Sequence, residues 1–147
     1  MKIIEVTDNK KQYISLLLSA DQQEDMIDRY LEKGSMYILD DSGIKAECVV
    51  TDEGNKILEI KNIATYPEFH GMGYGRKLIE FLIEFYSSDF DYLQVGTGDS
   101  PLTIPFYEKC GFVKHHVVKD FFLDNYDHPI IEDGIQLIDM IYLQMPI

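Results

Sequence analysis

The chain has 147 residues, 46% of them hydrophobic and 27% charged, which is typical of a single folded domain over residues 1–147. Its net charge of −13 argues against a nucleic-acid partner, because contacts with phosphates need a basic face, and it is compatible with a cationic small molecule. No apolar run approaches the ~20 residues of a membrane span, and the first residues lack the apolar core of a signal peptide, so we expect a cytoplasmic protein without a membrane partner.

Hydrophobic periodicity and turn residues predict alternating helices and strands along the chain. Ser19 and Gln22 form an S-x-x-Q capping box, which predicts the start of a helix that stops at Gly34. The expected strands cover residues 3–6, 36–39, 44–50, 57–65, 92–96, 112–118 and 136–145, and the other expected helices cover 10–18, a stretch from Arg76 to about Tyr86, and 103–109. The resulting order, β-α-α-β-β-β-α-β-α-β-β, predicts a mixed α/β domain.

Residues 119–134 are rich in acidic and aromatic side chains and are expected to form a long loop or lid. Acids and rings together suit the binding of a cationic amine by charge and by cation–π contacts. The same composition suits an exposed acidic loop with an aromatic anchor, and the sequence leaves both interpretations open.

Three glycines, Gly71, Gly73 and Gly75, stand at every second position between the strand at 57–65 and the following helix. Glycines there let the backbone approach a ligand closely, and their N–H groups form an anion-binding nest with the helix N-terminus. Arg76 adds positive charge beside this nest, which suits a pyrophosphate. A dinucleotide fingerprint would need glycine where Arg76 stands, and a P-loop is absent. A glycine-rich turn that binds nothing remains the alternative.

Two stretches together resemble the GCN5-related N-acetyltransferase (GNAT) superfamily. The sequence His70-Gly71-Met72-Gly73-Tyr74-Gly75 is similar to the family's Q/R-x-x-G-x-G/A signature, with His70 in place of Gln or Arg. The sequence Phe106-Tyr107-Glu108-Lys109-Cys110-Gly111-Phe112 is similar to its second signature, a short tyrosine helix that ends in Gly-Phe. The resemblance covers roughly residues 35–118 and implies a mixed, mostly antiparallel central sheet with helices on both faces.

The resemblance also implies a set of site residues. The strand end would pair through its main chain with the pantetheine arm of acetyl-CoA, and the glycine loop would hold the pyrophosphate. Asp99 replaces an asparagine that contacts the cofactor arm. Tyr107 would lie near the sulfur as the general acid. The implied cofactor-binding residues are Ile63, Ala64, Thr65, His70, Gly71, Met72, Gly73, Tyr74, Gly75, Arg76 and Asp99.

Glu59 is the candidate general base, because family members carry a glutamate at the matching place before the glycine loop. It stands an even number of residues from Ile63, so the two side chains are expected on the same side of the strand. The alternatives are that Glu59 pairs with Lys61 or faces water, and that water acts as the base. His115 and His116 are adjacent on a strand and so should face opposite ways, which argues against a shared metal, and no metal is expected.

The sequence thus predicts an N-acetyltransferase that moves an acetyl group from acetyl-CoA directly to a primary amine of a small, cationic acceptor. The alternatives are a CoA-binding regulator or sensor without turnover, an acetyltransferase of protein lysines or N-termini, and an interaction domain with an empty glycine turn. A homodimer that pairs through the last strand is compatible with the sequence.

Overall fold

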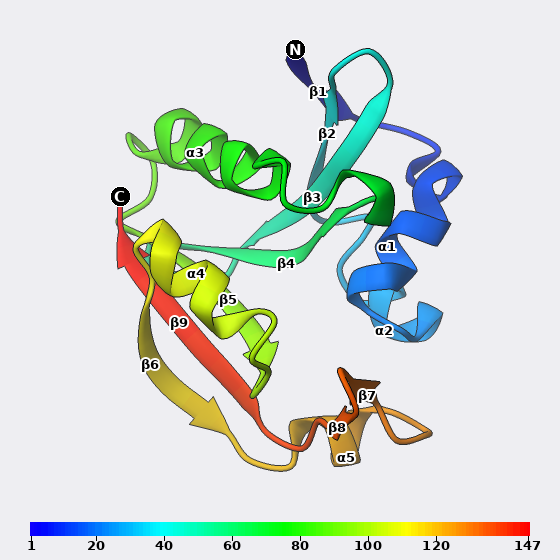
Figure 1. Cartoon of the computed structure of the whole chain (residues 1–147). Coiled ribbons are helices and arrows are strands. Elements are labelled where there is room, and N and C mark those ends of the chain that lie inside the picture. The colour runs from blue at the N-terminus through cyan, green and yellow to red at the C-terminus, as the bar shows by residue number, and fades with distance from the viewer.

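The computed structural model describes residues 1–147 and contains a seven-stranded sheet and a small two-stranded sheet. All neighbouring strands of the large sheet run antiparallel except β4 and β5, which run parallel. This confirms the predicted mixed, mostly antiparallel sheet (Figure 1). In spatial order the strands are β1 (Lys2–Val6), β2 (Ser35–Asp40), β3 (Ile44–Asp52), β4 (Ile57–Thr65), β5 (Tyr92–Gly98), β9 (Met140–Pro146) and β6 (Val113–Val118).

Helices cover both faces of this sheet, and each face has its own hydrophobic core. On one face α3 (Tyr74–Tyr86) and α4 (Ile104–Cys110) pack over a core that includes Leu78, Leu93 and Leu143. On the other face α1 (Ile14–Ala20) and α2 (Glu24–Asp28) pack over a smaller core that includes Leu17 and Val49. A sheet buried on both faces explains the nearly continuous apolar runs in its central strands.

The segment between residues 10 and 34 differs from its prediction. It opens with the 3₁₀ helix η1 (Lys10–Tyr13), and the capping box is wrong, since Ser19 lies inside α1 and its hydroxyl donates to the carbonyl of Leu16 at 2.6 Å. The helix α2 begins only at Glu24 and ends at Asp28. After Asp28 the chain continues to Gly34 in hydrogen-bonded turns, and the buried ammonium group of Lys10 donates to the carbonyls of Leu31 and Gly34 at 2.8 and 2.7 Å.

The segment 119–134, predicted as a loop, contains regular structure. It includes α5 (Phe121–Asn125) and β7 (Ile131–Glu132), which pairs with β8 (Ile135–Gln136). Phe122, Ile130 and Leu137 form a third small core beneath these elements. Polar contacts fasten the segment to the α1–α2 side, among them a hydrogen bond of 2.6 Å from the Tyr126 hydroxyl to the carboxylate of Asp21.

Two strands contain β-bulges that change the direction of side chains. Where β3 pairs with β4, Val49 lies opposite Asn62 and Val50 lies opposite Ile60. Lys61 is therefore an extra residue in β4. Glu59 and Asn62 therefore face the α1 side, while Ile60 and Ile63 face the α3 side, and the expectation that Glu59 and Ile63 point the same way is wrong. A bulge at His115 in β6 likewise brings the ring nitrogens of His115 and His116 within 2.8 Å, so the prediction that they face apart is also wrong.

One core position carries a carboxyl group. Glu47 on β3 is fully buried, and neither of its carboxyl oxygens has a hydrogen-bond partner. This burial raises the pKa of Glu47 well above its usual value, because the charged form loses its hydration. A carboxyl whose pKa is higher in the folded state contributes stability below its unfolded pKa and loses that contribution as the pH rises through its folded pKa.

We therefore expect Glu47→Gln to unfold at higher urea concentration than the wild type at pH 8 but at a similar concentration at about pH 4, below the pKa of ~4.3 of an unfolded glutamate. The gain should be at least about 1 kcal/mol, because a buried charged group without a partner costs that much or more. Urea titrations at both pH values measure the effect, with Glu84→Gln on the exposed side of α3 as the control. An equal difference between variant and wild type at both pH values would contradict a titrating Glu47.

Candidate active site

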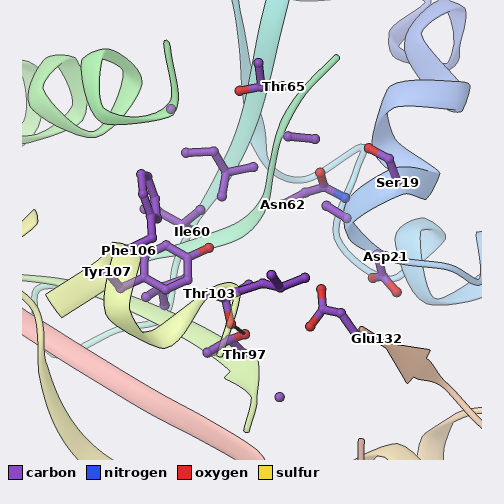
Figure 2. A pocket seen from close by; sticks show the side chains of 18 of the residues that line it. Ser19, Asp21, Ile60, Asn62, Thr65, Thr97, Thr103, Phe106, Tyr107 and Glu132 are labelled. Carbon is purple, nitrogen blue, oxygen red and sulfur yellow. Dashed lines mark hydrogen bonds between the residues drawn. The ribbon is translucent and has the colours of Figure 1, made fainter. Parts of the chain in front are cut away.

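A large cleft opens where β4 and β5 separate. Their parallel pairing ends at Ile60 and Val95, after which β4 continues beside β3 only and β5 beside β9 only. The cleft has a volume of about 660 Å³ and lies between the second half of β4, the end of β5 and the N-terminal ends of α3 and α4 (Figure 2). Beyond Ile60, β4 has no strand on its cleft side, so its backbone is available to an extended ligand.

The glycine loop forms one wall of this cleft. Gly71 and Gly73 have φ angles of 78° and 86°, in the left-handed region that favours glycine, and a Cβ atom at either position would meet nothing within 4 Å. Gly73 is the N-cap of α3, which has no side-chain cap, so the first N–H groups of a 13-residue helix are free to bind an anion. These features fit a pyrophosphate, and Arg76 on the cleft wall adds positive charge.

The remaining residues predicted for the cofactor divide into two groups. Ile63, Ala64, Thr65, His70, Tyr74 and Gly75 line the cleft with the loop, whereas Met72 and Asp99 are exposed and do not line it. A ring nitrogen of His70 lies 2.8 Å from the carbonyl oxygen of Thr65, so the imidazole braces the end of β4 where the family signature has Gln or Arg.

Tyr107 projects from α4 into the cleft opposite β4 (Figure 2). Its ring packs edge-on against Phe106 and Phe112, and only 7% of the residue is exposed. Burial raises the pKa of Tyr107 above its ordinary value, so the hydroxyl keeps its proton at physiological pH. The residue is therefore both a core aromatic and a hydroxyl donor on the cleft wall.

The sequence alone did not indicate several polar groups on the cleft walls. Thr97 at the end of β5 and Thr103 before α4 bring their hydroxyl oxygens within 2.6 Å of each other. Asn62 is buried, its amide nitrogen donates to the carbonyl of Leu17 at 3.0 Å, and its side-chain oxygen has no partner. The bulge in β4 orients Asn62 in this way, and only the register of the strand pair reveals it.

A second, smaller cavity of about 210 Å³ lies on the α1–α2 face of the sheet. Both cavities share Asp21, Ile60, Lys61, Gly96, Tyr126 and Met140, so they meet where β4 and β5 separate. Glu59 lines only this second cavity. Its carboxylate accepts a hydrogen bond of 2.6 Å from Gln94 and lies 2.9 Å from the ammonium nitrogen of Lys61.

Asp21 stands at the junction of the two cavities. Its carboxylate accepts hydrogen bonds from the hydroxyls of Tyr126 and Tyr30, at 2.6 and 3.0 Å. Burial raises the pKa of Asp21, and the two tyrosine hydrogen bonds offset part of that effect by stabilising the carboxylate. In Figure 2 its carboxylate and that of Glu132 both point toward the open space below Asn62. The junction therefore contains acidic groups that can bind an amine or take its proton.

No helix is long and apolar enough to cross a membrane. No group of three or more His, Cys, Asp or Glu side chains is arranged to hold a metal ion.

Comparisons with known proteins agree with this geometry. A sequence model of the acetyltransferase (GNAT) domain matches residues 32–114. The chain is 35% identical over 133 residues to the uncharacterized N-acetyltransferase YvbK of Bacillus subtilis (strain 168), covering 88% of this chain and 86% of that protein.

Two solved structures are similar over almost the whole chain. A GNAT family acetyltransferase from Elizabethkingia anophelis with acetyl-CoA bound has a TM-score of 0.92 and 34% identity, covering 99% of this chain and 97% of that one. The IAA acetyltransferase from Bacillus cereus ATCC 14579 has a TM-score of 0.89 and 32% identity, covering 99% of this chain and 100% of that one. With the glycine loop and the opening between β4 and β5, these matches establish that the chain belongs to the GNAT superfamily of N-acetyltransferases.

Proposed function

We propose that the chain moves the acetyl group of acetyl-CoA directly to the primary amine of a small acceptor. The observation that carries this proposal is the pair of cavities that meet between β4 and β5, because it lets a thioester and an amine enter from opposite faces of the sheet. A small acceptor is favoured over a protein chain, since Phe121 and Tyr126, at the two ends of α5, line the second cavity and leave it only about 210 Å³.

In this proposal acetyl-CoA occupies the larger cleft. The N–H groups of Gly71 to Gly75 and the side chain of Arg76 bind its pyrophosphate, and the free edge of β4 at Ile63 to Thr65 pairs with the pantetheine arm. A main-chain N–H near Ala64 donates to the carbonyl oxygen of the thioester, on which negative charge develops during attack. The relative with acetyl-CoA bound supports this assignment.

The acceptor amine reaches the junction from the second cavity. The amine must be neutral to attack, so a base takes its proton, and we assign this role to Glu59 because its carboxylate lines that cavity. Asp21 is the second candidate, since it lines both cavities and its desolvated carboxylate has a raised pKa. The departing thiolate receives a proton or a hydrogen bond from the hydroxyl of Tyr107. The acidic chain attracts an acceptor that arrives as an ammonium ion.

Calorimetric titration with acetyl-CoA, with NAD and ATP as controls, tests the proposal. We expect saturable binding of acetyl-CoA alone, followed by release of CoA when small primary amines are added. Binding without acetylation of any amine would favour a CoA-binding regulator instead. Absence of acetyl-CoA binding in a folded sample would contradict the assignment of the glycine loop.

For the base, we expect Glu59→Gln to lower kcat by roughly 10²- to 10⁴-fold while the affinity for acetyl-CoA is unchanged, because a general base contributes about that much. Glu53→Gln is the matched control, since Glu53 lies 3.9 Å from the same Lys61 ammonium group but lines neither cavity. Steady-state rates of the two variants make the comparison. Full activity of Glu59→Gln would exclude Glu59 and leave Asp21 or water as the base.

A further inference from the structure

The second cavity carries more positive than negative charge, although the chain has 26 acidic residues and only 13 basic ones. Three basic residues line it, Arg29, Lys33 and Lys61, against two acidic ones, Asp21 and Glu59. A charge balance opposite to that of the whole chain suggests that this cavity receives more than an ammonium group.

The two acidic side chains already have partners within the chain. One carboxylate oxygen of Glu59 accepts from Gln94 at 2.6 Å, and the other lies 2.9 Å from the Lys61 ammonium nitrogen. The two carboxylate oxygens of Asp21 accept hydrogen bonds from the hydroxyls of Tyr126 and Tyr30. Both carboxylates of the cavity thus have hydrogen-bond or ion-pair partners before any acceptor enters.

Arg29 and Lys33 are exposed and less fully paired, although the charge of Arg29 lowers the pKa of the Asp21 carboxyl. Neither forms a salt bridge, and Arg29 makes one side-chain hydrogen bond, from a guanidinium nitrogen to the neutral amide oxygen of Asn125 at 3.1 Å. A guanidinium group has five N–H donors in a planar fork, so most of them remain available. Such a fork matches a carboxylate or a phosphate group, and a nearby ammonium group adds charge.

We propose that the acceptor is a small zwitterion, a primary amine that also carries a carboxylate or phosphonate-like group. Arg29 and Lys33 hold the acidic group, and the amine points to the junction at Asp21. This inference rests on the proposed function and replaces the purely cationic acceptor that the overall charge suggests. A cavity of about 210 Å³ suits an acceptor of a few carbons, because drug-sized ligands occupy ~300–1,000 Å³.

The acidic group takes no part in the bond changes. The amine nitrogen forms a bond to the acetyl carbonyl carbon, the carbon–sulfur bond breaks, the proton of the amine passes to the base, and the thiolate takes a proton. The products are CoA and an N-acetylated acid, so recognition of the acidic group affects binding of the acceptor rather than the chemistry of transfer.

Four amines with chains of two or three carbons separate the possibilities: propylamine, 1,3-diaminopropane, β-alanine and 2-aminoethylphosphonate. With the full chain and saturating acetyl-CoA, we expect kcat/KM to be at least about tenfold higher for an acidic amine than for propylamine, and lowest for the diamine. β-Alanine and the phosphonate distinguish a carboxylate from a phosphate-like group. A preference for propylamine or the diamine would overturn the inference and leave the proposed function intact.

The double variant Arg29→Gln/Lys33→Gln tests the two residues. We expect it to raise KM for the acidic amines at least about tenfold and to change KM for propylamine much less. The control Lys114→Gln/Lys119→Gln makes the same change of net charge on exposed positions that line neither cavity. An equal loss with all amines, or the same loss in the control, would overturn the assignment.

Binding measured without turnover separates this inference from the proposed function. Calorimetric titration of β-alanine and 2-aminoethylphosphonate into the complex with CoA should give saturable binding that the double variant loses. Such binding without acetylation of any amine would contradict the proposed function and support the site for an acidic group. Acetylation of propylamine without such binding would support the proposed function and contradict the site for an acidic group.

Discussion

Gly73→Glu should bind acetyl-CoA at least about 100-fold more weakly than the wild type, as measured by calorimetric titration. Two physical effects combine. The residue has a φ angle of 86° at the N-cap of α3, which an L-amino acid adopts at a cost of roughly 1–3 kcal/mol. The carboxylate also enters the space that the pyrophosphate needs, beside N–H groups that would otherwise bind it.

Gly54→Glu is a closely matched control for this variant. Gly54 has a φ angle of 83° with open space around it, but it lies in the turn before β4, whereas the glycine loop follows the end of β4. Both variants should lose a similar amount of thermal stability, and only Gly73→Glu should lose affinity for acetyl-CoA. Equal affinity in the two variants would show that the loop does not hold the pyrophosphate.

Tyr107→Phe should lower kcat by roughly 10²- to 10⁴-fold with little change in the affinity for acetyl-CoA, because a general acid contributes about that much. Loss of one hydroxyl leaves the contacts of the ring with Phe106 and Phe112 in place. Because the pKa of Tyr107 is raised above ~10, the ordinary value of a tyrosine, the hydroxyl stays protonated. The ratio of the kcat of Tyr107→Phe to the kcat of the wild type should therefore be constant from pH 6 to pH 9.

Steady-state rates across that pH range measure the effect, and Tyr37→Phe serves as the control. Tyr37 also carries a buried hydroxyl in the core under α3, bonded to the hydroxyl of Tyr86 at 2.6 Å, but it does not line the cleft. Tyr37→Phe should retain the wild-type kcat. Full activity of Tyr107→Phe would leave the thiolate to be protonated by solvent.

The sequence predicted the parts of the site that depend on local backbone geometry. The spacing of Gly71 and Gly73 requires a particular turn before a helix, and the structure has that turn. The strand from Ile57 to Thr65 was predicted with its observed bounds, since apolar residues and flanking turns define it locally. The order along the chain of the large sheet's strands and of the helices between them followed from the same local signals.

What the sequence did not predict depends on pairing between distant segments. A bulge shifts every later side chain to the other face, and nothing in the sequence around Lys61 marks it, so Glu59 was expected beside Ile63 and Asn62 was overlooked. The role of Asp21 depends on Tyr126, which is 105 residues away along the chain. The positive charge of the second cavity likewise comes from the segment after α2 and from β4 together, while the composition gives only the sum over the chain.

The position of β9 between β5 and β6 has a consequence for biosynthesis. Both neighbours of β9 are translated before it, yet β6 has no other partner in the sheet, and β5 has only its four pairs with β4. The strands β1 to β4 can pair in the order in which they emerge from the ribosome. The part of the sheet formed by β5, β9 and β6, whose core includes Leu143, instead forms only when segments far apart in sequence come into contact. Such contacts are slow steps in folding. The opening between β4 and β5 is therefore completed late, when β9 fixes the position of β5.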